Sequence, residues 1–333
     1  MKAMVIRNFG GPEVFEKAEV DTPEVKPGFV LVKVAAGSIN PLETRLRAGL
    51  APAFTPPFPA ILNSDFSGEI VAVGSGVEDW QVGDEVIGGA GGIGAQQGAL
   101  AEYILVDANF LAPKPKNISH AKAALFPLVS ITAWEALREN AFIGPDDKLL
   151  IYGAAGGVGL MAVQLAKLMG ADVYGAVRSP RQAETAVSFG ADQTILVDEE
   201  KVEEFVAKHT QGKGFEAVFD TIGGNNLVNS LAAAKLKGRV CTTNARTTLD
   251  LTPMYQKALT LKAVLYVAPI FYNAPGERVR QGNILKNISQ FIAEGKLDIL
   301  QDERQFGFDE IQKAHEYVES NKNFGKISLI NNL

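Results

Sequence analysis

The stretch LLIYGAAGGVGLMAVQLAKLMGADVYGAVRSP (149–180) combines an apolar strand, a glycine-rich turn, a helix and a second apolar strand. The turn follows the first strand directly and opens the helix, as in a dinucleotide-binding βαβ unit. Gly156 and Gly157 let the backbone approach phosphate groups, and Gly159 lets the helix pack closely on the strand. The usual GxGxxG pattern is broken only by Ala154, which stands at its first glycine. A tight turn without a ligand is the alternative, and the strands and helix around the turn favour binding.

The residues after the second strand indicate which dinucleotide is bound. Folds that bind NAD usually place an acidic residue at the end of this strand, where it holds the ribose hydroxyl. Here the strand ends in Val177, and Arg178, Ser179 and Arg181 follow within one turn. Guanidinium groups and a hydroxyl suit the charge and the acceptor oxygens of a 2′-phosphate. A basic helix start chosen for solubility is the alternative, but the helix dipole disfavours it. We therefore expect NADPH rather than NADH.

A second glycine-rich segment, GGAGGIGAQQG (88–98), matches the GxGxxG pattern literally through Gly89, Gly91 and Gly94. The residues after it read as another glycine and then a strand, so no helix N-terminus is available to face a pyrophosphate. We expect a flexible loop between strands here and no second nucleotide site.

Apolar strands alternate with helices from residue 147 to residue 268. Strands that are apolar on both faces and alternate with helices predict a parallel, doubly wound sheet. Six strands suit the order 3-2-1-4-5-6. Helices at 225–237 and 252–261 are expected to precede the last two strands. The strands are expected at 149–154, 172–177, 193–198, 216–223, 238–244 and 262–268.

The rest of the chain follows a different pattern. Before residue 121, short apolar segments separated by Gly and Pro predict an antiparallel, partly barrel-like β domain. A helical stretch at 119–140, with Ser119 as its N-cap, leads into the parallel sheet. After residue 274 the chain reads as two helices and a terminal strand, which are expected to complete the first domain. The expected domains are therefore 1–121 with 274–333, for substrate and catalysis, and 122–273, a Rossmann domain for NADPH.

Composition narrows the class of protein. Hydrophobic residues make up 47% and charged residues 21%, which is ordinary for a globular protein, and the net charge of −6 argues against nucleic-acid binding. No apolar run predicts a transmembrane helix, and the start lacks the apolar region of a signal peptide. The single cysteine, Cys241, is expected to be buried and unreactive. With one cysteine the chain cannot form an internal disulfide, which fits a cytoplasmic setting. His120, His209 and His315 lie far apart and are expected at the surface or in helix caps.

Several segments together resemble the medium-chain dehydrogenase/reductase superfamily, and most of all its zinc-free quinone oxidoreductase branch. The resemblance covers nearly the whole chain. It implies an α/β protein with a Rossmann doubly wound parallel sheet and a GroES-like, mostly antiparallel β-barrel domain. The segments are AGSINPLETRLRAG (36–49), SGEIVAVGSGVEDWQVGDEVIG (67–88), GALAEY (98–103), SITAWEAL (130–137), YGAAGGVG (152–159) and GKISLI (325–330).

Zinc-dependent members of the superfamily carry a catalytic Cys and a His-Glu pair at positions that here read Asn40, Ser64 and Asp65. The four-cysteine lobe for structural zinc is absent, and a single cysteine could not fill it. Alcohol oxidation in this superfamily uses zinc to stabilise an alkoxide. Hydride addition to a conjugated carbonyl spreads charge into an enolate, which hydrogen-bond donors can stabilise. The resemblance thus implies an NADPH-dependent, metal-independent reductase of quinones or α,β-unsaturated carbonyls.

The resemblance also implies which residues form the site. Asn40 is the candidate for positioning the nicotinamide or the substrate, and an ordinary Asn-Pro turn is the alternative. Arg45 stands where several quinone reductases have a tyrosine. It is a candidate for polarising the substrate oxygen, with an exposed helical arginine as the alternative. Cofactor contacts are expected from Thr132, Ala155, Gly156, Gly157, Val158, Gly159, Arg178, Ser179, Arg181 and Ile222.

Two other functions are compatible with the sequence. One is an NADPH-binding protein with little turnover and a structural or regulatory role. The other is an enoyl-thioester reductase, which the lack of carrier domains and of a basic groove for a pantetheine phosphate makes less suitable. The apolar strand at 262–268 comes at the sheet edge, so a homodimer formed edge to edge is expected. No nucleic-acid or membrane partner is expected.

Overall fold

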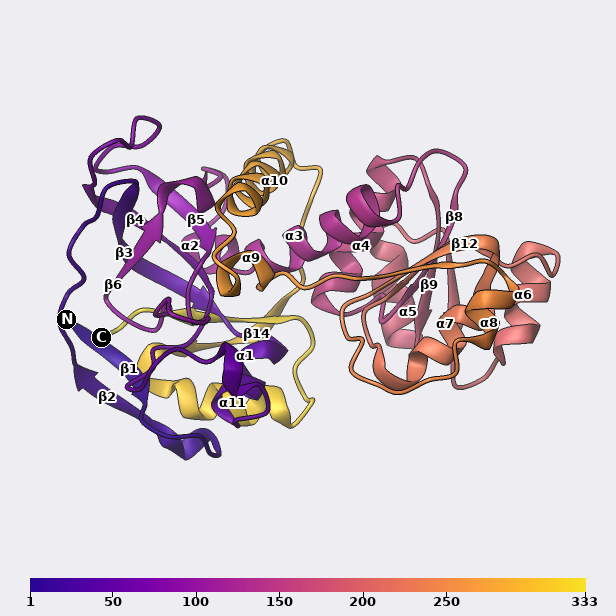
Figure 1. Cartoon of the computed structure of the whole chain (residues 1–333), viewed down its shortest axis with the longest axis horizontal. Helices are drawn as coiled ribbons and strands as arrows, with labels where there is room; N and C mark the ends of the chain where they lie inside the picture. The colour runs from indigo at the N-terminus through magenta and orange to yellow at the C-terminus, as the bar shows by residue number, and fades with distance from the viewer. The chain divides into compact units, whose positions relative to one another are not determined.

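The computed structural model describes all 333 residues, and they form two compact units. The first unit contains Met1–Leu128 and Val267–Leu333, and the second contains Val129–Tyr266. The chain therefore passes through the second unit once and then returns to complete the first (Figure 1). None of the helices has the length and apolar character that crossing a membrane requires.

The second unit is built on a six-stranded parallel sheet with the order β10-β9-β8-β11-β12-β13. In chain order this is 3-2-1-4-5-6, so the predicted topology is confirmed. Figure 1 shows the helices on both sides of the strands, with α4 and α5 on one side and α6 and α7 on the other. The strands are β8 (Lys148–Tyr152), β9 (Asp172–Val177), β10 (Gln193–Leu196), β11 (Phe215–Asp220), β12 (Ala234–Thr242) and β13 (Thr260–Ala263). The helices are α4 (Gly157–Leu168), α5 (Pro180–Ser188), α6 (Val202–Thr210), α7 (Leu227–Ala233) and α8 (Thr252–Gln256).

The core of the second unit explains why its strands read as continuous apolar runs. Leu150, Phe205, Phe215 and Val218 are buried in one cluster between the sheet and its helices. A parallel sheet covered on both faces buries successive side chains on both sides. Cys241 on β12 is also buried, and this burial raises the pKa of its thiol to about 12. The prediction that this cysteine is buried is therefore confirmed.

Two boundaries in the second unit differ from those predicted. Helix α7 ends at Ala233, and the next four residues begin β12 instead of extending the helix. Strand β13 lies at Thr260–Ala263, earlier than the predicted strand, and replaces the end of the predicted helix before it. Ala234 pairs with Phe215 of β11, and Thr260 pairs with Arg239 of β12. Strand pairing thus overrides the local preference of an Ala- and Lys-rich segment for helix.

The first unit is largely antiparallel, as predicted. Its main sheet has the order β14-β15-β3-β4-β5-β7, and β6 also pairs with β3; only β14 and β15 run parallel. Strand β14 was not predicted, because its sequence QDERQFG has no apolar alternation. A separate pair, β1–β2, completes the unit. The strands are β1 (Lys2–Ile6), β2 (Phe15–Glu19), β3 (Phe29–Ser38), β4 (Asp65–Val73), β5 (Glu85–Gly89), β6 (Tyr103–Asp107), β7 (Leu111–Pro113), β14 (Gln301–Gly307) and β15 (Lys326–Ile330).

The helices of the first unit include a short one, α1, that follows β3 directly. The predicted helical stretch at 119–140 is divided into α2, α3 and a π-helical segment, Glu135–Asn140. Ser119 accepts a hydrogen bond from the backbone N–H of Lys122, which confirms it as an N-cap. The helices of this unit are α1 (Pro41–Arg47), α2 (His120–Ala123), α9 (Ala268–Phe271), α10 (Pro275–Ala293) and α11 (Ile311–Glu319), while α3 (Pro127–Trp134) carries the chain from the first unit into the second.

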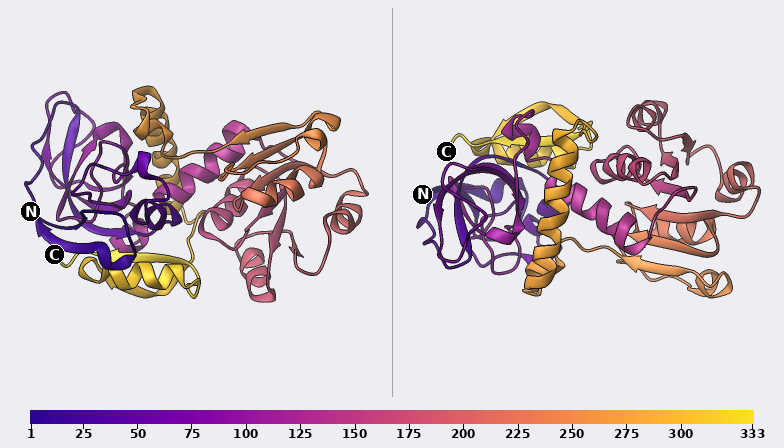
Figure 2. Two further views of the ribbon diagram at one scale, coloured as in Figure 1. Left: turned by 60° about the horizontal axis from the view of Figure 1, so that its bottom comes forward. Right: turned by 90° about the horizontal axis from the view of Figure 1, so that it is seen from above.

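The C-terminal segment completes the main sheet of the first unit. Strand β15 lies beside β3, where Ser328 pairs with Ser38. Both views in Figure 2 show the yellow C-terminal segment beside the indigo start of the chain. The side chain of Lys2 donates to the carbonyl of Leu333 at 2.9 Å, so the two ends of the chain meet.

One histidine does not lie where the sequence predicted. His315 of α11 is fully buried, and its ring packs edge-on against Phe15 with the centroids 4.8 Å apart. Burial, together with the nearby charge of Arg47, lowers the pKa of His315 to about 3, so the ring is neutral. The prediction of a surface or capping residue was wrong because a neutral imidazole packs on the apolar face of an amphipathic helix as an aromatic ring does.

The glycine-rich loop between β5 and β6 leads into no helix, as predicted. It packs against the segment before β4, where a Cβ on Gly98 would lie 2.0 Å from the carbonyl oxygen of Leu62. Its glycines therefore allow close backbone packing inside the first unit.

Candidate functional site

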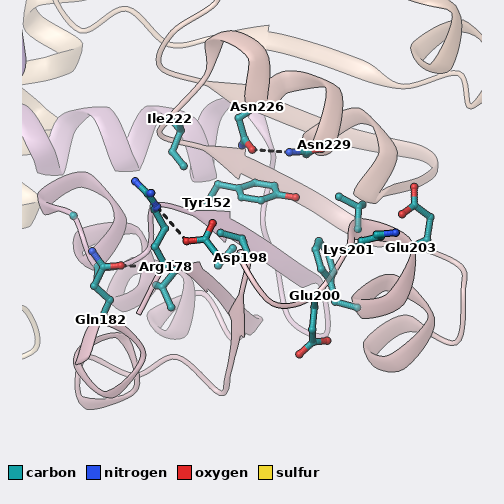
Figure 3. A pocket seen from close by; sticks show the side chains of 18 residues that line it. Tyr152, Arg178, Gln182, Asp198, Glu200, Lys201, Glu203, Ile222, Asn226 and Asn229 are labelled. Atoms are coloured by element: carbon teal, nitrogen blue, oxygen red, sulfur yellow. Dashed lines mark hydrogen bonds and ion pairs between the residues drawn. The ribbon is translucent and has the colours of Figure 1, made fainter. Parts of the chain in front are cut away.

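A pocket of about 510 Å³ opens in the second unit at the carboxyl ends of its strands (Figure 3). The ends of β8, β9, β10 and β11 line it, together with the glycine turn and the start of α6. Doubly wound sheets bind their ligands at this edge, at the point where the strand order reverses. The two central strands β8 and β11 lie at that point in this sheet.

The glycine turn forms one wall of the pocket. Gly153 adopts a left-handed conformation (φ +72°), and Gly156 is the N-cap of α4. A Cβ on Gly159 would lie 2.1 Å from the carbonyl oxygen of Gly153, so only glycine lets the helix pack this closely on β8. Unpaired N–H groups at the N-terminus of α4 thus lie beside the pocket and favour an anion there.

Arg178 follows the last residue of β9 and lines the pocket. Its backbone N–H donates to Oε1 of Gln182 at 2.9 Å, and its guanidinium Nε lies 3.5 Å from a carboxylate oxygen of Asp198. Both charged side chains are mostly exposed, so this ion pair is weak. Ser179 is the N-cap of α5, and its hydroxyl accepts from the N–H of Gln182.

The structure brings some of the predicted cofactor residues together and not others. Ala155, Gly156, Arg178 and Ile222 line the pocket, and Gly157, Val158 and Gly159 form the first turn of α4 beside it. Ser179 and Arg181 lie in the first turn of α5 but do not line the pocket. Thr132 lies in α3, where its hydroxyl is buried without a hydrogen-bond partner.

Two residues that the sequence did not indicate contribute polar groups to the pocket. The hydroxyl of Tyr152 and the amide nitrogen of Asn226 are buried and have no hydrogen-bond partner. Burial raises the pKa of Tyr152, and the nearby carboxylate of Asp220 adds to this effect, so the phenol stays protonated. Tyr152 immediately precedes the glycine turn and could have been noticed there as a polar end to an apolar strand. Asn226 ends a short 3-10 helix (Gly224–Asn226) directly before α7, and this segment carries no comparable signal.

Asp220 at the end of β11 holds the loop that carries Ile222. Its Oδ1 accepts from the backbone N–H groups of Ile222 and Gly223, at 2.9 and 2.8 Å. Its other oxygen accepts from the hydroxyl of Ser230 at 2.9 Å. All these acceptor positions are used within the protein, so Asp220 shapes the pocket rather than binding a ligand.

A second group of polar side chains lies inside the first unit, and we call Asn40, Glu43, Asp65 and Lys326 the buried ionic cluster. All four are buried. Asn40 donates through Nδ2 to Asp65 Oδ2 at 2.8 Å and accepts through Oδ1 from the ammonium of Lys326 at 2.5 Å. That ammonium lies 3.8 Å from Asp65 Oδ2. The amide of Asn40 is therefore engaged at both ends.

Glu43 connects this cluster to the start of α1. Its carboxylate accepts from the backbone N–H of Asn40 at 2.7 Å, and from the backbone N–H and the hydroxyl of Ser64, both at 3.3 Å. Burial and, second, the charge of Asp65 raise the pKa of Glu43 to about 7. Burial also raises the pKa of Asp65 and lowers that of Lys326, while the opposite charge of each partner limits the shift.

Arg45 lies on α1, five residues after Asn40. Its guanidinium Nε is buried and has no hydrogen-bond partner. Its neighbour Arg47 is buried and forms an ion pair with Glu319, so the two arginines of this helix differ in their surroundings.

No group of three or more His, Cys, Asp or Glu side chains is arranged to hold a metal ion. The side chains of Asn40, Ser64 and Asp65 form hydrogen bonds inside the protein. Asn40 donates a hydrogen bond to Asp65, and the hydroxyl of Ser64 donates one to Glu43.

Comparison with known proteins gives a consistent result. Residues 26–116 match the alcohol dehydrogenase GroES-like domain, and residues 157–281 match the zinc-binding dehydrogenase family. The chain is 32% identical to the chloroplastic NADPH-dependent alkenal/one oxidoreductase of Arabidopsis thaliana, over 98% of this chain and 78% of that protein. It is also 32% identical to a quinone oxidoreductase of Salmonella typhimurium, over 96% of this chain and 97% of that one.

Solved structures agree with these relatives. An alcohol dehydrogenase superfamily protein from Novosphingobium aromaticivorans superposes with a TM-score of 0.93 and 34% identity over 99% of both chains. The Escherichia coli quinone oxidoreductase, solved in complex with NADPH, superposes with a TM-score of 0.85 and 29% identity over 99% of this chain and 100% of that one.

Proposed function

Because the chain belongs to the medium-chain dehydrogenase/reductase superfamily, in the branch of the quinone oxidoreductases, we propose that it is an NADPH-dependent reductase of quinones or α,β-unsaturated carbonyls. The observation that carries this proposal is the pocket of the second unit, where Arg178 and the start of α4 offer two separate sites for phosphate. The names of the relatives, which include an alkenal/one oxidoreductase and quinone oxidoreductases, support the same class of reaction.

The residues of the pocket fit NADPH. The glycine turn leaves room for backbone to approach a pyrophosphate, and the N-terminus of α4 favours its charge. Arg178 lines the pocket and can bind a 2′-phosphate, with Ser179 next to it in the chain and Arg181 about one turn further along. The buried, unpartnered groups of Tyr152 and Asn226 require a polar partner that a bound nucleotide can supply. Bound NADPH supplies the hydride for the reduction.

We assign the substrate side of the reaction to the first unit. The buried Nε of Arg45, without a partner, is a donor that can stabilise negative charge developing on a carbonyl oxygen. Asn40 is the N-cap of the helix that carries Arg45, and its amide is held on both sides. We therefore assign Asn40 the role of orienting this helix for the substrate. Protonation of the product is left to water.

The test is a turnover assay with purified protein, NADPH, and a panel of quinones, enals and enoyl thioesters. We expect turnover with quinones or enals and little with thioesters. An Arg45→Met variant should lose about two to three powers of ten in kcat, the effect of removing one preorganised donor, with little change in melting temperature. NADPH binding without turnover on any substrate would instead support the low-turnover structural or regulatory role. Preference for thioesters would support an enoyl-thioester reductase.

We also propose a homodimer formed through β13. This strand is the end of the parallel sheet and pairs only with β12, so its outer edge has free N–H and C=O groups. Leu265, two residues after it, is 47% exposed. Sedimentation at micromolar concentration should give twice the mass of one chain. A charged residue introduced at Leu265 should reduce the measured mass to that of one chain. A monomeric wild type, or an unchanged mass after the insertion, would overturn the proposal.

A further inference from the structure

The nucleotide pocket contains two hydrogen-bonding atoms that nothing in the protein satisfies. They are the hydroxyl oxygen of Tyr152 and Nδ2 of Asn226, both buried and both from residues that line the pocket. Leaving a buried donor unpaired costs about 1–3 kcal/mol, so native structures avoid it unless a ligand or water completes the bond. Two such groups on one pocket indicate a ligand with hydrogen-bonding atoms of its own.

The Asn226 amide is held in one orientation. Its Oδ1 accepts from Nδ2 of Asn229 at 3.1 Å, so its own Nδ2 is the atom left open. Figure 3 shows this contact at one side of the pocket, with the nitrogen of Asn226 on the side away from Asn229. An amide nitrogen can only donate, and it therefore calls for an acceptor on the ligand.

The ring of Tyr152 is equally fixed. It is 2% exposed and belongs to the apolar cluster that includes Leu150, Phe205 and Leu227. Figure 3 shows the ring lying across the middle of the pocket, between Asn226 and Asp198. Its hydroxyl can rotate to meet a partner, and no group of the protein provides one. The hydroxyl can donate or accept, so it suits either kind of ligand atom.

The rest of the pocket restricts the ligand further. Ile222 follows β11 and Val177 ends β9, and both present apolar surface to the pocket. A flat heteroaromatic ring with acceptor nitrogens on its edge matches an apolar slot bordered by two donors. Adenine is such a ring, and its three free ring nitrogens are acceptors.

We propose that Tyr152 and Asn226 recognise the adenine base of the cofactor through hydrogen bonds to its ring nitrogens, and that Asn229 is a positioning residue which orients Asn226. This inference rests on the proposed function, since it names the part of the same cofactor that these residues select. It assigns base recognition to the Tyr152–Asn226 pair, and leaves phosphate recognition to Arg178 and the start of α4.

The test measures binding of 2′,5′-ADP, which is the adenosine half of NADPH, and of reduced nicotinamide mononucleotide, which lacks adenine. Tyr152→Phe and Asn226→Leu should each weaken 2′,5′-ADP about three- to tenfold, the effect of one hydrogen bond, and leave the mononucleotide unchanged. Asn229→Leu should have a smaller effect in the same direction, because it only frees the amide of Asn226 to rotate. Tyr174→Phe is the matched control, since the hydroxyl of Tyr174 donates to Asp172 at 3.0 Å and does not line the pocket.

A second measurement uses the protein without nucleotide. Tyr152→Phe removes an unsatisfied hydroxyl, so its melting temperature should equal or exceed that of the wild type. Tyr174→Phe loses a hydrogen bond and should melt lower. Affinities for 2′,5′-ADP within twofold of the wild type in both pocket variants would overturn the inference and leave the proposed function intact. A wild-type protein that binds neither NADPH nor 2′,5′-ADP would overturn both.

Discussion

The pocket of the second unit and the buried ionic cluster of the first unit are both polar centres in an apolar interior, and they differ in whether their groups are paired. In the pocket, Tyr152 and Asn226 keep open hydrogen-bonding atoms, and Arg178 has only an exposed, weak ion pair. In the cluster, the Lys326 ammonium has a carbonyl and a carboxylate as partners. Unpaired groups that line a pocket can bind a ligand there, whereas the paired groups of the cluster contribute to holding the first unit together.

The only cation of the cluster is the ammonium of Lys326. Lys326 neutralises Asp65 and fixes the amide of Asn40. The fixed ammonium group thus stabilises the buried polar side chains inside the first unit. Predictions about the two centres should therefore separate cleanly into effects on stability and effects on binding.

The largest effect is expected from Lys326→Met. It leaves Asp65 buried without its cation, and breaking a buried pair on one side costs about 3–5 kcal/mol of folding free energy. Chemical denaturation should report this loss. Lys313→Met, which removes an exposed ion pair with Glu310, is the control and should cost less than about 1 kcal/mol. Adding Asp65→Asn to Lys326→Met should restore part of the stability, and its failure to do so would contradict the pairing argument.

The next effect concerns the pH dependence of stability. The pKa of Glu43 is raised by burial to about 7 in the folded protein, so the folded state holds this proton more tightly than the unfolded state, where the value is 4.5. The stabilisation is complete below pH 4.5 and is lost as the pH rises through 7, with a slope of at most about 1.4 kcal/mol per pH unit. Glu43→Gln cannot titrate and should flatten this part of the stability profile. Parallel profiles for wild type and variant would argue against a shifted Glu43.

A smaller effect is expected on the binding side, from Arg178→Ala. Loss of a charge-assisted contact to the 2′-phosphate should weaken NADPH by about 1.5–3 kcal/mol and leave NADH nearly unchanged. Fluorescence titration with both cofactors measures this difference. Arg181→Ala, one turn further along the chain, tests whether the second arginine shares the phosphate. Equal affinities of the wild type for NADPH and NADH would refute the assignment of this pocket to a 2′-phosphate.

The smallest effect is expected from Asp198→Asn. This change removes the carboxylate that lies 3.5 Å from the Arg178 guanidinium and that repels a phosphate in the same pocket. Because both side chains are exposed and screened, NADPH affinity should rise by less than about 1 kcal/mol, and the gain should shrink with added salt. Glu184→Gln, on the exposed surface of α5, provides a control of equal charge change. Unchanged or weaker NADPH binding would show that Asp198 does not compete for Arg178.

The sequence predicted the parallel sheet well because its signals are local. Apolar runs, glycine turns and amphipathic helices each lie within a short segment, and the strand order follows from the resemblance to the Rossmann fold. The same local reasoning failed at the start of β12, where the Ala- and Lys-rich segment is held as strand by partners on β11. It also missed β14, because its sequence has no apolar alternation and the strand forms by pairing with β15.

The polar groups of the two centres also differ in how local their sequence signals are. The place of Arg178 at the pocket could be predicted because it directly follows a strand, and the carboxyl ends of the strands form the binding edge of the sheet. The partnership of Lys326 with Asn40 could not, because 286 residues separate them and no periodic pattern connects the two. Nor could the sequence show that the hydroxyl of Tyr152 has no partner, because that depends on every side chain around it.

The return of the C-terminal segment to the first unit gives this chain a particular order of assembly during synthesis. Strand β3 is translated before the second unit, but β15, which pairs with its second half, is translated after it. Until Lys326 arrives, Glu43 and Asp65 lack the cation that makes their burial tolerable. The first unit can therefore close fully only after the second has been translated, and a nascent chain without β15 leaves the carboxylates of Glu43 on α1 and Asp65 on β4 without this cation. Lys326 thus links the closing of the first unit to a segment that is translated after the second unit.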